Sequence, residues 1–328
     1  MAASTPPGAV LERRLPAPHR RMGATMWPSK EVERARIVAA LVAAKTALGL
    51  KGLPDDKTIE ALSMQFVASL RRENYFQLVQ AKPIAADRAN PNSASFDPER
   101  AVAHQMQQGN VDEAGWLIFL MTHFARPVSG WKRLKDVYGG LGTGTWDWAK
   151  VAADPDSFFE WLAANWQAIG GAFGNHRKYE SLNPAKNRPM RRAVSDYLAW
   201  IGPAGHAAFF KNAVHSAGND PHTIFDYLYN SLKIHSFGRL AKFDYLSLVS
   251  RFRLAPIEAG SAYLDGATGP GRGARLLVHG NPKSATGNAE IQMKLDELDV
   301  ALKVGMAVME DALCNWQKSP RKFVHHIG

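Results

Sequence analysis

The chain has 328 residues, of which 46% are hydrophobic and 21% charged, a composition typical of a globular protein with a sizeable core. Its 40 basic and 30 acidic residues give a formal net charge of +10, which favours a polyanionic partner such as nucleic acid. The single cysteine, Cys314, excludes an internal disulfide, a cysteine-based zinc site and an iron–sulfur cluster, and favours a reducing, cytoplasmic location. No apolar run has the length of a membrane span, and the N-terminus lacks the apolar core of a signal peptide.

Residues 1–28 are rich in proline and arginine and contain one acid, Glu12. Such a composition buries too little apolar area to offset chain entropy, so we predict a disordered basic tail. The tail either contacts DNA phosphates without specificity or is an inert extension. Residues 29–328 form the predicted domain, with a possible division into two lobes of about 29–200 and 201–328.

From residue 29 onward, apolar residues recur at spacings of three and four, the period of an amphipathic helix. We predict helices over residues 31–48, 56–72, 111–124, 131–138, 155–165, 191–200, 221–232, 236–252, 271–278 and 289–316, and a loop over 82–98. No stretch alternates as a strand does, and no Asn-Gly or Asp-Gly turn joins two apolar runs. The sequence therefore predicts an all-α fold.

Residues 263–277 are the most informative segment, because they place several glycines directly before an apolar helix. In such a turn the backbone N–H groups point outward unobstructed, and the positive end of the following helix adds to an anion site. Arg272 and Arg275 supply further positive charge on the same turn. The segment is typical of a hairpin that binds a DNA phosphate, although a plain glycine-rich loop before a helix would have the same sequence pattern.

The Gly269-Pro270-Gly271 turn before Ala274 resembles the hairpin of helix-hairpin-helix DNA glycosylases. The stretches 109–117, 173–182, 237–245 with the following hairpin, and 310–318 resemble the alpha-glutamyl/putrescinyl thymine pyrophosphorylase family, and its third clade most closely. The resemblance covers roughly residues 60–325. It implies a glycosylase-like helical bundle in which the hairpin anchors double-stranded DNA while a modified base is flipped into a pocket.

This resemblance implies two chemistries. One is a monofunctional DNA glycosylase that excises a bulky modified pyrimidine, as in defence against bacteriophages with hypermodified thymine. The other is a transferase that displaces pyrophosphate from an activated 5-hydroxymethyl pyrimidine with an amine or amino acid. A non-catalytic DNA-binding module is a third reading. We favour the glycosylase, and we expect a monomer that needs no cofactor and no metal.

A glycosylase needs a carboxylate near the sugar, where positive charge builds as the glycosidic bond breaks. In helix-hairpin-helix glycosylases this carboxylate belongs to an aspartate about twenty residues beyond the hairpin. In this sequence the corresponding position falls near Glu290, with Asp296 and Asp299 as alternatives. Gly273 stands where bifunctional members have a lysine, so we predict no Schiff-base step.

Among the acids of the matching stretches, Asp244 and Glu310 are two further candidates for the catalytic carboxylate. Asp244, between Phe243 and Tyr245, is either a functional acid or the partner of Arg239. Glu310 is either functional or a buried ion-pair acid.

The stretch 173–182 is the best candidate for a base pocket. A flipped pyrimidine needs a stacking ring and hydrogen bonds to its edge. His176 and Tyr179 could stack, Asn175 could read an amide edge, and Glu180 could act as acid or base. The alternative is a basic, DNA-facing or solvated loop. We assign DNA contacts to Gly269, Gly271, Arg272, Gly273, Arg275, Arg177, Lys178 and Arg239.

Overall fold

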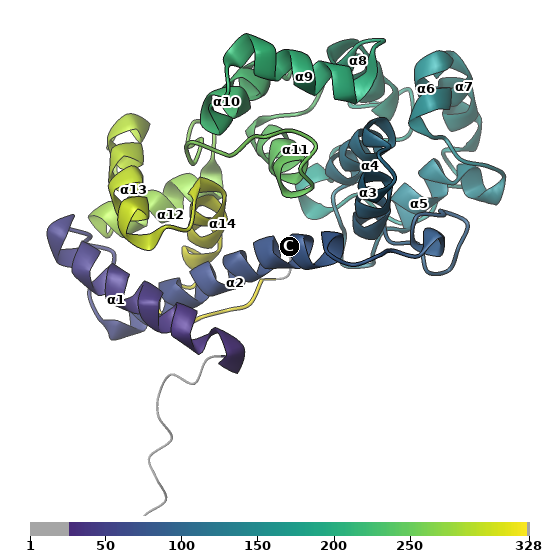
Figure 1. Ribbon diagram of the computed structural model, residues 1–328. Helices are drawn as coiled ribbons and strands as arrows, with labels where there is room; N and C mark the ends of the chain where they lie inside the picture. Colours follow the sequence, from purple (N-terminus) through teal and green to yellow (C-terminus); the bar gives the residue numbers. More distant parts are fainter. Residues whose placement is uncertain (1–25, 327–328) are drawn as a thin grey trace, which may run out of the picture.

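The computed structural model describes residues 26–326, which form fourteen α-helices and four short 3-10 helices and contain no β-strand (Figure 1). The predicted all-α fold is confirmed. Residues 1–25 of the predicted tail lie outside the described residues. The rings of Phe323 and His325 pack edge-on against Trp27, so the two ends of the described chain lie together.

The helices follow one another along the whole described chain. In order they are η1 (Pro28–Lys30), α1 (Glu31–Ala47), α2 (Asp56–Gln80), η2 (Ala86–Arg88), α3 (Pro98–Gln107), α4 (Val111–Phe124), α5 (Lys132–Tyr138), η3 (Gly140–Gly142), α6 (Trp148–Ala153), α7 (Pro155–Asn165), η4 (Asn175–Arg177), α8 (Met190–Ile201), α9 (Gly205–Ala217), α10 (Pro221–Ser231), α11 (Arg239–Arg251), α12 (Thr268–His279), α13 (Asn288–Leu302) and α14 (Met306–Trp316).

The helix ends follow local chemistry. The Asp55 side chain accepts from the Thr58 N–H and so caps α2, while Asp154 and Asp220 cap α7 and α10 in the same way, each followed by proline. The bounds of α4 and α7 match the predicted ranges. The predicted helices did not include α3, α6 and α9, and the predicted helix over 289–316 is in fact two.

The break between α13 and α14 has a clear cause. Lys303 and Gly305 have positive φ angles of 51° and 82°, a left-handed region that ends a helix. The Asp299 carboxylate accepts from the N–H groups of Val304 and Gly305 at 2.9 and 3.0 Å, which fixes the turn.

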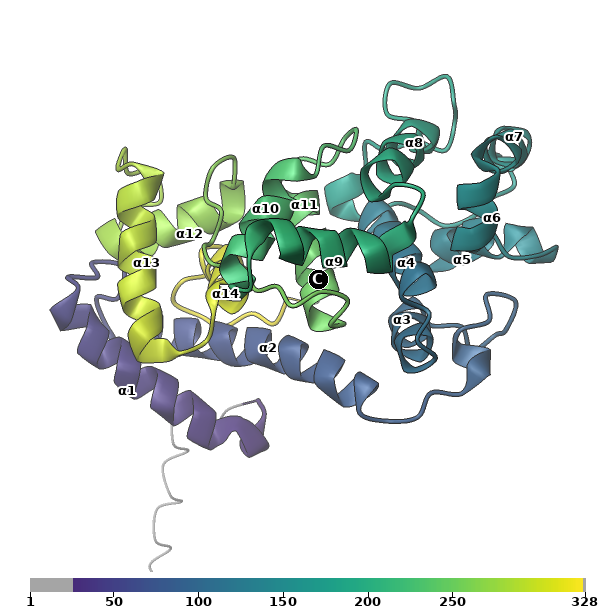
Figure 2. The same cartoon turned by 45° about the horizontal axis from the view of Figure 1, so that its top comes forward.

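Helices from the two ends of the described chain pack together. The long helix α2 packs against α14 and α1, and α12 packs against both α13 and α14. Helices α5, α6 and α7 lie at the far end of the molecule from α1, α12 and α13 (Figures 1 and 2). Between the two ends, α11 contacts α4, α10 and α2. The possible division near residue 200 stays a prediction.

Candidate active site

Helix α11 presents one accessible carboxylate, that of Asp244. Its neighbours Phe243, Tyr245 and Leu246 are at most 4% exposed, so they hold the helix in place. Surrounding atoms nevertheless desolvate the Asp244 carboxyl and raise its pKa to about 6. Asp244 has no hydrogen bond or ion pair with any residue in 26–326.

Charged groups surround Asp244 closely enough to act on its pKa. Arg251, Arg239 and Arg177 lower it and Asp311 raises it, but desolvation outweighs all four. We call these five residues together with Glu310 the central cluster. Its arginines are engaged elsewhere: the Arg251 guanidinium binds the Glu73 carboxylate of α2 with N–O distances of 2.5 to 3.0 Å. Asp244 is thus the free acid of the cluster.

Arg239 pairs with Glu310 and not with Asp244, the partner that the sequence had offered. Its Nη1 lies 2.5 Å from Glu310 Oε1, and both side chains are less than 10% exposed. Two further donors reach the carbonyl oxygens of Tyr263 and Ala262 at 2.8 and 2.5 Å. Burial raises the pKa of Glu310 to about 7 in spite of Arg239. Arg239 and Glu310 therefore form a buried pair that supports the cluster from the interior.

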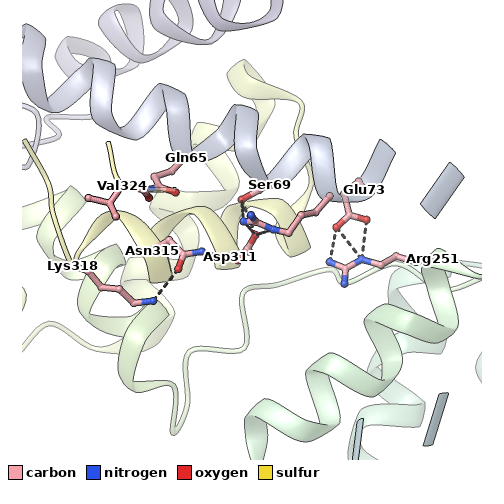
Figure 3. A network of polar contacts seen from close by, with 9 residues as sticks. Gln65, Ser69, Glu73, Arg251, Asp311, Asn315, Lys318 and Val324 are labelled. Atoms are coloured by element: carbon pink, nitrogen blue, oxygen red, sulfur yellow. Dashed lines mark hydrogen bonds and ion pairs between the residues drawn. The ribbon is translucent and has the colours of Figure 1, made fainter. Parts of the chain in front are cut away.

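A polar network around Asp311 of the cluster joins α2 to α14 (Figure 3). Asp311 accepts from Ser69 Oγ at 2.7 Å and from Arg72 Nε at 3.0 Å, and its other oxygen accepts from Asn315 at 2.9 Å. Lys318 in turn donates to Asn315 Oδ1 at 2.9 Å. The sequence analysis missed this network. Only the position of Asp311 beside Glu310 could have pointed to it.

The loop over 173–182 has an inner and an outer side. Arg177 is buried, donates to the carbonyl oxygens of His123 and Ser236 at 3.2 and 2.8 Å, and lies over the Phe237 ring. Glu180 is buried too, and its carboxylate accepts from Ser236 Oγ at 2.6 Å. These two predicted site residues anchor the loop, so Arg177 is not exposed to a phosphate and Glu180 is not exposed to a base.

The outer side of this loop carries Asn175, His176, Lys178 and Tyr179, all of which are exposed. Partial burial, with a contribution from Lys318, lowers the pKa of His176, so its imidazole is neutral at pH 7. The predicted base-pocket residues therefore stand beside α14, but on an open surface.

The predicted hairpin lies within the first turns of α12. A Cβ atom on Gly273 would come within 2.2 Å of the Leu313 carbonyl oxygen, and one on Gly269 within 2.6 Å of Cys314 Sγ. These two glycines allow α12 to approach α14, a packing role that the prediction of phosphate contact did not include. Gly271 is buried as well.

The two arginines of the hairpin differ. Arg275 donates to Gly271 O at 3.1 Å and to Asn288 Oδ1 at 2.5 Å, which joins α12 to the start of α13. Arg272 is exposed and has no partner among residues 26–326, so it remains available for a phosphate.

A scan against protein families decides the assignment: the model of the alpha-glutamyl/putrescinyl thymine pyrophosphorylase family, clade 3, matches residues 57–328. The chain belongs to this family. No curated protein and no solved structure shows a significant match. The family description names an enzyme that acts on modified thymine, and DNA is the partner that it suggests. The helix-hairpin-helix likeness stays a prediction.

The stretches that carried the family resemblance converge on one place. Those over 173–182, 237–245 and 310–318 supply Arg177, Asp244 and Glu310 to the central cluster. The stretch over 109–117 instead begins α4, where the Asp112 carboxylate accepts from the N–H of His206 at 2.5 Å. In this family member the cluster is accordingly the best candidate for the reaction centre.

Glu290, the carboxylate placed by analogy with glycosylases, stands apart. It is exposed in the first turn of α13 and is not among the charges that act on Asp244 or Glu310. Asp299 fixes the turn after α13, and Asp296 accepts from Gln292 at 2.7 Å. All three acids lie on α13, outside the cluster.

Two cavities of about 320 and 300 Å³ lie near the C-terminal helices. The larger is lined by residues of α2, α11 and α14, among them Ser247 and Arg251. Ser247 is 5% exposed, and its hydroxyl has no partner in the described part of the chain. Within residues 26–326 we find no group of side chains suited to a metal ion, and none of the helices there is both long and apolar enough to cross a membrane.

Proposed function

We propose that this family member is a monofunctional DNA glycosylase that excises a bulky modified pyrimidine, and that Asp244 is its catalytic carboxylate. The observation behind this proposal is that Asp244 is the accessible acid of the cluster and has no partner among residues 26–326, while every neighbouring arginine is engaged. Defence against bacteriophage DNA with hypermodified thymine is the setting that fits such a substrate.

The chemistry needs one ionised carboxylate. As the glycosidic bond breaks, positive charge develops on the sugar, and a fixed negative charge beside it lowers the barrier. Asp244 has a pKa of about 6, so at pH 7 it is mostly ionised and can also accept a proton from the attacking water. The buried Arg239–Glu310 pair and the Arg251–Glu73 pair keep these arginines from neutralising it.

The larger cavity offers room for the substituent of the base. Asp244, Ser247 and Arg251 follow one another at helical spacing along α11, so they share a face. The unpartnered Ser247 hydroxyl can bind a polar atom of the substituent, while the apolar lining takes its carbon atoms. This arrangement would favour a bulky modified pyrimidine over plain thymine.

DNA binding is attributed to exposed cations that lie outside the ion pairs of the cluster. Lys178 and Arg272 are exposed on different elements, and the formal net charge of +10 adds long-range attraction. Affinity for duplex DNA should therefore fall steeply with added salt.

The first test uses duplex oligonucleotides that each carry one 5-substituted pyrimidine: 5-hydroxymethyluracil, its pyrophosphate ester or glucosylated 5-hydroxymethylcytosine. We expect abasic sites from at least one of them and none from thymine. Asp244→Asn should lower the rate about 10²- to 10³-fold, the usual loss for one stabilising group. The wild-type rate should fall as pH drops below about 6, because Asp244 then becomes protonated.

Glu290→Gln is the matched control, since it removes a carboxylate outside the cluster and should leave the rate unchanged. A normal rate for Asp244→Asn, or a large loss for Glu290→Gln, would refute the assignment of Asp244. The absence of abasic sites from every substrate would refute the glycosylase. If the protein binds DNA but forms neither abasic sites nor transferred products from any substrate, it is a non-catalytic DNA-binding module.

The second candidate is a transferase that displaces pyrophosphate from an activated 5-hydroxymethyl pyrimidine with an amine or amino acid. The family description favours it, because it names a pyrophosphorylase. Asp244 would then act as the base that takes a proton from the amine. Mass spectrometry of the nucleosides separates the two reactions, because transfer leaves the glycosidic bond intact.

A further inference from the structure

Tyr179 has the most exposed ring among the tyrosine, phenylalanine and tryptophan side chains of residues 26–326. It is 70% exposed, whereas Tyr227 on α10, the next most exposed, is 44% exposed. The ring contacts the ammonium group of Lys178, which lies 5.2 Å from its centroid. A large ring left in solvent beside a flexible cation is typical of a surface that meets a partner.

The backbone that carries Tyr179 is firmly fixed. Residues on either side of the ring, Arg177 and Glu180, are buried and bound to the 234–238 turn through Ser236. The N–H of Gly174 donates to Phe124 O at 2.8 Å, which holds the start of the loop against α4. The ring is therefore presented on a pre-organised loop, and little conformational entropy is lost when it meets a partner.

The loop borders the proposed reaction centre. Arg177 lies close enough to Asp244 to affect its pKa, and Lys318 does the same to His176. Arg188 reaches Glu180 from a half-exposed position and adds a further cation to the loop. A DNA strand that bound these cations with its phosphates would bring its bases next to Tyr179.

A wall of a base pocket is covered by protein on its other sides, whereas the Tyr179 side chain is 70% exposed. A ring that projects freely can instead enter a stack of bases. Resting on the proposed function, we infer that Tyr179 inserts into duplex DNA and fills the gap that the extruded nucleotide leaves. Its π-face replaces one lost stacking contact, so the flipped state becomes more populated.

Tyr179→Ala tests this on a duplex with one 5-hydroxymethyluracil, or whichever substrate proves active, next to 2-aminopurine. The fluorescence of 2-aminopurine rises when its neighbour leaves the stack. We expect Tyr179→Ala to lose most of that rise and to react about 5- to 150-fold more slowly, the value of one base–aromatic stack. Tyr179→Phe should restore both signals. Tyr227→Ala is the matched control and should match wild type.

A single-stranded oligonucleotide with the same modified base distinguishes a ring that inserts into the duplex from a ring that forms a wall of the base pocket. A single strand has no duplex gap to fill, so Tyr179→Ala should react there at the wild-type rate. An equal loss on single and double strands would overturn the inference, because it would show contact with the reacting base itself. Wild-type behaviour on both substrates would overturn it too. If the wild-type protein neither flips a base out of any modified duplex nor reacts with one, that outcome refutes the proposed function itself.

Discussion

At the scale of single residues, Arg239 is a buried hydrogen-bond donor on which the structure of the cluster depends. It satisfies two carbonyl oxygens and the Glu310 carboxylate at once, and its guanidinium lies 4.6 Å from the Phe243 ring centroid. Arg239→Leu should cost about 3–5 kcal/mol of unfolding free energy, because it leaves these buried acceptors unpaired. Urea unfolding at pH 7 measures the loss. Glu310→Gln keeps an acceptor for Arg239 and should cost clearly less.

The loss in Arg239→Leu should also grow as pH rises from 7 to 8. Without Arg239 the pKa of Glu310 must lie above its present value of about 7, and so further above that of the unfolded chain. A folded-state pKa above the unfolded one lowers stability as pH rises between the two values. In the wild type, the free energy of unfolding stops falling near pH 7, the pKa of Glu310. In the variant that pKa is higher, so the free energy of unfolding continues to fall above pH 7. Equal losses at both pH values would contradict the role of the pair.

Residue types in the sequence identified candidate acids but could not rank them. Asp244, Glu180 and Glu310 all stand in matching stretches, and only tertiary contacts show that the last two are buried with partners while Asp244 is free. The same limit explains Arg177: its charge suggested DNA contact, but its place over Phe237 depends on a turn almost sixty residues away. Which charged side chains pair with one another depends on the tertiary structure, and the local sequence does not show it.

At the scale of elements, the contact between α12 and α14 depends on Gly273. Any side chain there would meet the Leu313 carbonyl oxygen, a backbone atom that cannot move alone. Gly273→Ala should therefore destabilise the protein by about 1–3 kcal/mol, the usual cost of overpacking. Denaturant unfolding measures it. Gly144→Ala is the matched control, because a Cβ there meets nothing within 4 Å, and a loss as large as that of Gly273→Ala would contradict the argument.

Elements with strong local patterns were predictable, and those without were not. The apolar run and acidic first turn of α4, and the Asp-Pro start of α7, fixed both helices within their own sequence. By contrast, α9 starts at Gly205 and takes its N-terminal partner from Asp112, far away in the chain. The split of 289–316 was hidden because Lys303 adopts a positive φ that its residue type does not indicate.

At the scale of the whole molecule, helices from the two ends of the described chain pack against each other. α2 packs along α14, and Trp27 contacts Phe323 and His325. Fragments of residues 29–200 and 201–328 would each expose apolar faces that the other covers. We expect neither fragment alone to unfold cooperatively on heating, and an equimolar mixture to regain a cooperative transition. Cooperative unfolding of 201–328 alone would support the lobes predicted from the sequence.

A circular permutant separates this packing argument from any damage done by cutting the chain. A short linker from residue 326 to residue 26 joins ends that already lie together, and new ends between Ala185 and Lys186 fall in an exposed loop. Exposed loops of this kind tolerate new termini well. The permutant should therefore unfold cooperatively near the wild-type temperature, although its chain is opened in the same region as in the fragments, before α8 and not within it. If the permutant fails while fragment 201–328 succeeds, the contact of α2 with α14 is not what unites the fold.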